Sequence, residues 1–136
     1  MASLDDLYGR AHRSAFSKKA RRNRFDALLN NKQYNLVGFY PAGGYTAKIL
    51  QMYAEFFGEP KFKTVLFDSN PNFWGKSGPR GIPVHSPQDI MAVKPQVIIV
   101  SNYNYSDEIY NSLAQYQTNG IEMIRLHKDS DVPWNF

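Results

Sequence analysis

LVGFYPAGGYTAKILQMYAEFFGEPKFKTVLFD, residues 36–68, places one amphipathic segment between two short apolar runs. The first run, Leu36–Tyr40, is bounded by turn residues, as expected for a buried parallel strand. After the turn, apolar residues recur at helical spacing as far as Phe57, and Gly58 stands where a C-capping glycine belongs. Thr64–Asp68 is the second run. Strand, helix and strand in this order predict a right-handed crossover within a parallel sheet.

The same alternation continues toward the C-terminus. Ser86 begins a helix as its N-cap, with a proline at the first helical position. A second helix starts at Ser106 and ends near Gly120. Further strands are expected at Ile82–Val84 (minor), Gln96–Ser101 and Glu122–Leu126. We therefore predict an α/β fold, a Rossmann-like three-layer sandwich with a mostly parallel sheet of four to five strands, preceded by an N-terminal helical arm.

The chain divides by charge and pattern into three parts: a basic helical arm at 1–33, the α/β domain at 34–128 and a tail at 129–136. Residues 1–32 carry eight Lys or Arg against three Asp, so the net charge of +4 comes from the arm. This arm has two interpretations, a solvated helix face or a phosphate-binding surface for nucleic acid. The side chains expected to bind nucleic acid are Arg13, Lys18, Lys19, Arg21 and Arg22.

Composition narrows the class of protein. No apolar run is long enough for a transmembrane helix, so we expect no membrane partner. The N-terminus lacks the apolar stretch of a signal peptide, and there are no cysteines, so a cytoplasmic location is expected. His12, His85 and His127 show no metal-ligand spacing, and no metal site is predicted.

Polar residues follow three of the predicted strands, at the edge where ligands of such sheets bind. Gly43 and Gly44 begin the first long helix, where backbone N–H groups can approach an anion. Asp68 ends the second strand, and its carboxylate can accept ribose hydroxyls or can serve as a turn residue. Asn102 follows a third strand. Only one of the three glycines of a dinucleotide fingerprint is present, so an ordinary turn is the alternative.

A longer pattern resembles a known kind of module. The pattern consists of FDSNP (67–71), WGK (74–76), GIPV (81–84) and KPQVIIVS (94–101). It resembles Rossmann-like domains that are attached to methyltransferases and sugar-modifying enzymes of surface-polysaccharide and deoxysugar pathways. One form is the C-terminal domain of sugar C-methyltransferases, and another belongs to nucleotide-sugar enzymes. The resemblance covers roughly residues 35–126. It implies that Gly43, Asp68 and Asn70 face a nucleotide or nucleotide-sugar site.

The predicted function is an accessory module that binds a nucleotide, a nucleotide-sugar or an adenosine cofactor and serves sugar modification or methyl transfer. NAD(P) and S-adenosylmethionine are the candidate cofactors, and no catalytic residue is assigned. In the relatives this module accompanies a catalytic domain, so we expect a catalytic partner protein or a homo-oligomer. Two alternatives remain: a structural or nucleic-acid-associated protein that uses the basic arm, and a small enzyme of a nucleotide-sugar pathway that acts with a partner chain.

Overall fold

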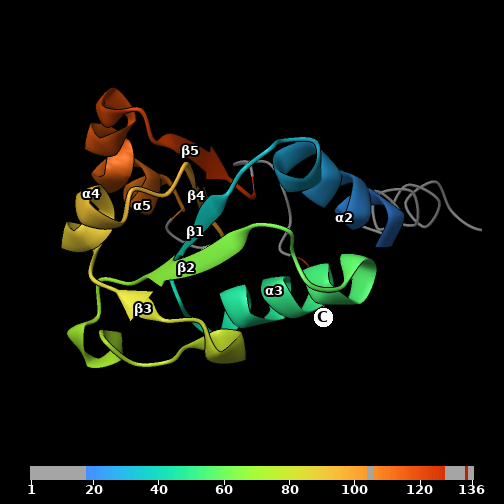
Figure 1. Cartoon of the computed structure of the whole chain (residues 1–136), viewed down its shortest axis with the longest axis horizontal. Coiled ribbons are helices and arrows are strands. Elements are labelled where there is room, and N and C mark those ends of the chain that lie inside the picture. The colour runs from blue at the N-terminus through green and yellow to red at the C-terminus, as the bar shows by residue number, and fades with distance from the viewer. Residues whose placement is uncertain (1–17, 104–105, 128–133, 135–136) are drawn as a thin grey trace, which may run out of the picture. The chain divides into compact units, whose positions relative to one another are not determined.

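A five-stranded sheet forms the centre of the larger of two units in the computed structural model, which describes residues 18–103, 106–127 and 134 (Figure 1). All neighbouring strands of this sheet run parallel, which confirms the predicted α/β class. The strands are β1 (Leu36–Tyr40), β2 (Lys63–Phe67), β3 (Val84–His85), β4 (Val97–Val100) and β5 (Glu122–Arg125).

The spatial order of the strands is β3-β2-β1-β4-β5. From β1 the chain winds outward through β2 to β3, and it then crosses back to place β4 on the other side of β1. This is the order of doubly wound, Rossmann-type sheets, in which the winding reverses beside the first strand. Because all strands are parallel, their carboxyl ends lie at one edge, with the end of β1 between those of β2 and β4.

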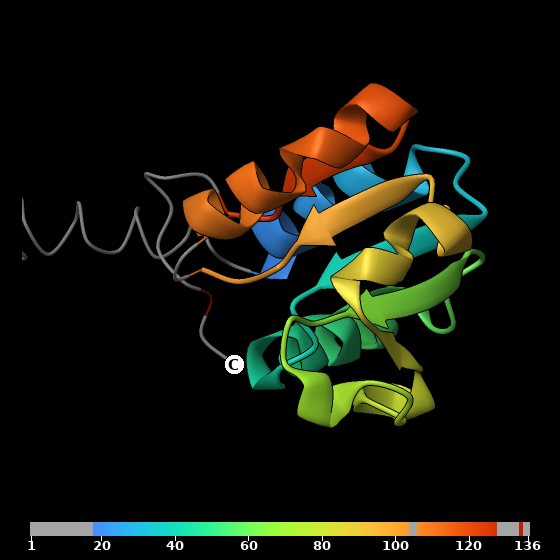
Figure 2. The same cartoon turned by 90° about the vertical axis from the view of Figure 1, so that its left-hand side faces the viewer.

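Helices cover both faces of the sheet (Figures 1 and 2). On one face lies α3 (Gly44–Phe57), which buries Ile49, Leu50 and Tyr53. The other face carries α4 (Ile90–Val93) and α5 (Ser106–Leu113). There, one core cluster joins residues from four strands to α4 and α5: Tyr40, Val65, Phe67, Ile90, Ile98, Val100, Leu113, Ile121 and Met123. With both faces covered, the strands are almost continuously apolar, as the sequence predicts.

Gly38 sits in the middle of the central strand for a packing reason. A Cβ atom at this position would lie 3.0 Å from Cε2 of Phe67 and 3.3 Å from Cγ1 of Ile98. Phe67 is completely buried, so its ring is enclosed by other parts of the protein. The missing side chain of Gly38 is therefore what makes room for the Phe67 ring on this face of the sheet.

The predicted helix ends correspond to observed capping interactions. α3 ends at Phe57, and Gly58 follows with φ of 76° while its N–H bonds the carbonyl of Ala54. The hydroxyl of Ser86 accepts the N–H of Gln88, which confirms Ser86 as an N-cap. The helix from Ser106 differs in form from the prediction. It is α-helical only to Leu113 and continues as a 3₁₀ turn over Ala114–Asn119, ahead of Gly120.

The minor strand lies one to two residues beyond its predicted position at Ile82–Val84. Pro83 has no N–H to donate to the ladder, although its carbonyl accepts the N–H of Leu66, so β3 itself begins at Val84.

The loop between β2 and β3 has regular structure of its own. It contains two 3₁₀ turns, Pro71–Phe73 and Pro79–Gly81, and Gly75 and Lys76 exchange backbone hydrogen bonds with Val84.

The smaller unit, Met1–Gln33, is described from residue 18 onward. Its helix α2 (Lys18–Phe25) has no acidic residue in its first turn and is followed by a π-helical turn over Asp26–Asn30. The predicted helical arm at 1–33 is thus helical over residues 18–30, and its first 17 residues lie outside the described part of the chain. Of the predicted C-terminal tail, only Trp134 is described.

Candidate functional site

Three loops that carry predicted site residues meet at the carboxyl edge of the sheet. Gly43 and Gly44 follow β1, Asp68 and Asn70 follow β2, and Asn102 follows β4. Since β1 pairs with both β2 and β4, the structure brings all five residues to the place where the winding of the sheet reverses. This is the position at which doubly wound sheets bind ligands.

Asp68 joins two of these loops through backbone hydrogen bonds. Its Oδ2 accepts the N–H of Ala42 at 2.9 Å, and its Oδ1 accepts the N–H of Asn70, also at 2.9 Å. The residue is only 7% exposed. Asn70 in turn accepts the N–H of Asn72 and so begins the 3₁₀ turn that follows. The interpretation of Asp68 as a turn residue is therefore confirmed, and its contact with a ribose stays a prediction.

A second link joins the loop after β1 to the end of β4. The hydroxyl of Thr46 donates to the carbonyl oxygen of Pro41 at 2.6 Å and hydrogen-bonds the hydroxyl of Ser101. Ser101 also reaches the carbonyl oxygen of Tyr40 at 3.3 Å. Both hydroxyl residues are almost completely buried. When Gly43 is aligned with the second glycine of the dinucleotide fingerprint G-x-G-x-x-G, Thr46 takes the place of the third. Its side chain fills that place and joins the loop to the end of β4.

Gly43 and Gly44 form an open part of the edge. A Cβ atom at either position would meet no protein atom within 4 Å. Gly43 is the N-cap of α3 with φ of −79°, so its backbone conformation does not require glycine. Neither packing nor strain explains these two glycines, whereas the close approach of a ligand would. The 14-residue helix α3 also directs its first N–H groups and the positive end of its dipole toward this space.

An aromatic cluster that sequence reasoning missed lies around His127, which follows the end of β5. The hydroxyl of Tyr45 is 2.6 Å from Nε2 of His127 and accepts the backbone N–H of Trp134 at 3.0 Å. The His127 ring also packs edge-on against Tyr103 and Trp134. His127 is 1% exposed. The position of His127 directly after a predicted strand was a signal that it could belong to the carboxyl edge. Its partner Tyr45, however, is 82 residues away in sequence.

The electrostatics of the edge keep the Tyr40 phenol neutral. Burial raises the pKa of Tyr40 above its ordinary value of 10.0, and the negative charge of Asp68 acts in the same direction. A hydrogen bond with Ser69 opposes the shift without cancelling it. Tyr40 therefore serves this edge as a buried hydrogen-bonding group and stays protonated around neutral pH.

The model of one protein family, the C-methyltransferase C-terminal domain, matches residues 8–126 and so spans most of the chain. The chain belongs to this family. The match includes all five strands and the three loops of the carboxyl edge. It establishes the association with methyltransferases that the sequence pattern implied. The chain matches none of the curated proteins with which it was compared.

The remaining predicted sites fall into two groups. In α2, Lys18, Lys19 and Arg22 are exposed and Arg21 is partly buried, while Arg13 lies outside the described residues. Nucleic-acid binding by this segment stays a prediction. Within the described ranges, no group of three or more His, Asp or Glu side chains is arranged to hold a metal ion. In that same part of the chain, no helix has the length and apolar character needed to cross a membrane.

Proposed function

We propose that this domain binds the diphosphate of a nucleotide-sugar at the Gly43–Gly44 turn and presents the sugar to a C-methyltransferase active site. The single observation that carries the proposal is the open space in front of these glycines at the N-terminus of α3. A diphosphate suits that position because backbone N–H groups at a helix N-terminus bind anions without a charged side chain. Family membership supplies the link to methyl transfer.

The surrounding side chains support a sugar-nucleotide in preference to a bare phosphate. Each Asp68 oxygen accepts one backbone N–H and retains a second lone pair for a hydroxyl group. Asn102, partly buried after β4, adds an amide at the same edge. A ligand that carries both phosphate and hydroxyl groups can therefore use the glycine turn and these polar side chains together.

The test is a titration of the full chain with UDP-glucose, dTDP-glucose and S-adenosylmethionine, followed by ¹H–¹⁵N NMR. We expect at least one sugar nucleotide to shift the amide signals of Gly43 and Gly44 in a saturable manner. In Gly44→Ala the added methyl group meets no protein atom, so the fold is retained while the ligand is obstructed. We expect this variant to bind at least about tenfold more weakly, the loss of about one good anion contact.

Ser112→Ala on α5, an exposed position, is the matched control and should bind as the wild type does. Absence of binding by both sugar nucleotides would refute the proposal. So would binding that Gly44→Ala leaves unchanged, because the ligand would then lie elsewhere. Binding of S-adenosylmethionine alone at the glycine turn would transfer the site from the methyl acceptor to the methyl donor and would also overturn it.

A further inference from the structure

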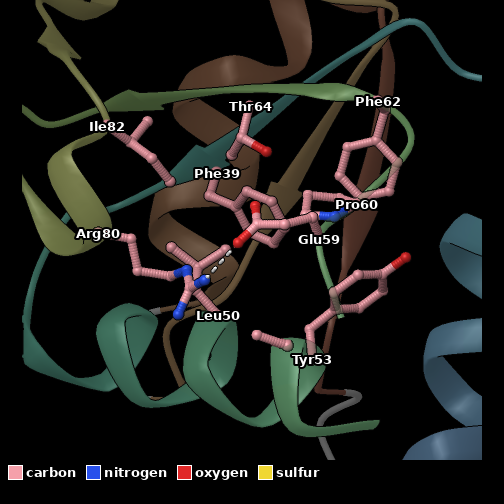
Figure 3. A pocket seen from close by; sticks show the side chains of 10 residues that line it. Phe39, Leu50, Tyr53, Glu59, Pro60, Phe62, Thr64, Arg80 and Ile82 are labelled. Atoms are coloured by element: carbon pink, nitrogen blue, oxygen red, sulfur yellow. Dashed lines mark hydrogen bonds and ion pairs between the residues drawn. The ribbon is translucent and has the colours of Figure 1, made fainter. Parts of the chain in front are cut away.

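A pocket of about 270 Å³ lies between α3 and the β1–β2 face of the sheet, away from the carboxyl edge (Figure 3). None of the site residues Gly43, Gly44, Asp68, Asn70 and Asn102 lines it, although two lining residues, Arg80 and Ile82, lie in the same β2–β3 connection as Asp68. Phe39 and Thr64 contribute from the strands, and Leu50, Tyr53 and Ala54 contribute from α3. The remaining lining residues come from loops: Glu59, Pro60, Phe62, Arg80 and Ile82.

Arg80 reaches this pocket from a strained turn. Its backbone lies in the left-handed region at φ 57° and ψ 25°, which is unfavourable for a residue with a side chain. The turn is closed by backbone bonds from Gly81 to the carbonyl of Gly78 and from Ile82 to that of Pro79. Glycine would adopt this conformation without strain, so an arginine here indicates that the guanidinium group has a use.

The guanidinium group of Arg80 is held by two neighbouring side chains. It donates to Oε1 of Gln51 and to Oε1 of Glu59, both at 3.1 Å, as the dashed line to Glu59 in Figure 3 shows. The Glu59 side chain is 86% exposed, whereas that of Arg80 is 33% exposed. Exposed ion pairs of this kind contribute little stability, because both groups are well solvated when separated. An incoming carboxylate can therefore replace Glu59 on Arg80 at little cost.

The interior of the pocket suits an aromatic ring. Figure 3 shows the rings of Tyr53 and Phe62 on one side and Ile82 with Arg80 on the other. Phe39 is 2% exposed, and the centroids of the Tyr53 and Phe62 rings are 5.7 Å apart. The lining also contains polar groups, the hydroxyls of Tyr53 and Thr64 beside the charged side chains of Glu59 and Arg80. A volume slightly below the usual 300–1,000 Å³ of ligand pockets indicates a small molecule with one ring.

We propose that this pocket binds a small carboxylate that carries a single aromatic ring, with its carboxylate held by Arg80 in place of Glu59. The ring packs between Tyr53 and Ile82, and the planar guanidinium group donates hydrogen bonds to both carboxylate oxygens. This site is separate from the proposed nucleotide-sugar site, and either one can fail while the other stands.

The probe is 4-hydroxyphenylacetate, titrated into the full chain and followed by ¹H–¹⁵N NMR. A ligand of this size is expected to bind with a Kd of about 1 mM. Arg80→Gly removes the charge and relieves the left-handed strain, so we expect at least about tenfold weaker binding with an unchanged or higher melting temperature. Arg80→Gln, which keeps most of the side-chain length, should lose binding equally.

Glu59→Gln is the opposite perturbation. It removes the competing carboxylate, so we expect tighter binding than in the wild type. Lys61→Ala, an exposed lysine outside the pocket lining, is the control for general charge and should bind as the wild type does. The neutral 4-hydroxyphenylacetamide should bind at least about tenfold more weakly than the acid, because it presents one acceptor oxygen instead of two.

The proposal is overturned if no saturable shift of pocket signals appears up to about 10 mM probe, tenfold above the expected Kd. It is also overturned if the arginine variants bind as well as the wild type, if Glu59→Gln binds no more tightly, or if the amide binds as well as the acid.

Discussion

Replacing Asp68 with asparagine keeps the size of the side chain but converts one acceptor oxygen into an NH₂ donor. In the native structure each carboxylate oxygen accepts a backbone N–H at 2.9 Å, one from Ala42 and one from Asn70. Whichever oxygen the amide nitrogen replaces, a backbone N–H then faces another donor. With Asp68 only 7% exposed, water cannot easily restore that bond. Loss of a hydrogen bond to a charged acceptor costs about 1.5–3 kcal/mol, and this is the destabilisation we expect.

Urea and thermal unfolding of the full chain measure this loss. For a unit of about 100 residues, each kcal/mol lowers the melting temperature by about 4–8 °C, so a fall of about 6 °C or more is expected. Asp89→Asn is the matched control, because the Asp89 side chain is 55% exposed and its contact with His85 spans 4.0 Å. An exposed pair of this kind contributes little, and the control should stay within about 0.5 kcal/mol of the wild type.

A variant Asp68→Asn that is as stable as the wild type would show that the carboxylate does not join the loops after β1 and β2. If the variant is destabilised as expected, Asp68 substitutions cannot be used to test ligand binding directly. Such a variant loses binding through the collapse of the edge whether or not the carboxylate touches a ligand. Gly44→Ala, which adds a methyl group into open space, is free of this ambiguity.

Three further changes test the packing and electrostatics of the sheet. Gly38→Ala places a methyl group 3.0 Å from the buried Phe67 ring and should lower the free energy of unfolding by about 1–3 kcal/mol in urea titrations. Thr46→Val removes the hydroxyl that bonds the Pro41 carbonyl and should cost about 1–3 kcal/mol by the same measurement. Burial raises the pKa of Tyr40 above 10.0, so its contribution to stability is complete below pH 10.0 and is lost as the pH rises through the folded-state value. The decline of stability in alkaline urea titrations should therefore be smaller in Tyr40→Phe than in the wild type.

The α/β architecture could be predicted because its signals are local. An apolar run such as Leu36–Tyr40 fits a strand buried on both faces, and Gly58 ends a helix by adopting a positive φ that other residues avoid. The prediction failed by one or two residues at β3, where the N–H missing from Pro83 delays the ladder. The order of the strands could not be predicted from such local signals. It depends on which apolar faces pack together, and residues close in sequence carry little of that information.

The candidate site was predictable in place but not in its connections. The rule that ligands of parallel sheets bind at the carboxyl ends located Gly43, Asp68 and Asn102 without any contact being known. The partner of Asp68, the N–H of Ala42, lies 26 residues earlier, and a backbone N–H leaves no mark in the sequence. Tyr45 and His127, 82 residues apart, also meet only after the sheet has formed. Local patterns therefore indicate the edge, and the tertiary fold determines its hydrogen bonds.

The glycines of this domain show why a fingerprint is weaker evidence than the surroundings of each residue. Gly38 and Gly78 are required by packing, since a Cβ atom would lie 3.0 Å from Phe67 and 2.8 Å from Val84, respectively. Gly43 and Gly44 adjoin open space at a helix N-terminus. A motif weighs all glycines alike and finds only one of the expected three here. The space in front of each glycine and its φ angle together separate the glycines that the fold requires from those that a ligand would require, since Gly58 and Gly120 also adjoin open space but need glycine for their positive φ. By both criteria the turn after β1 is where we propose that the anion binds.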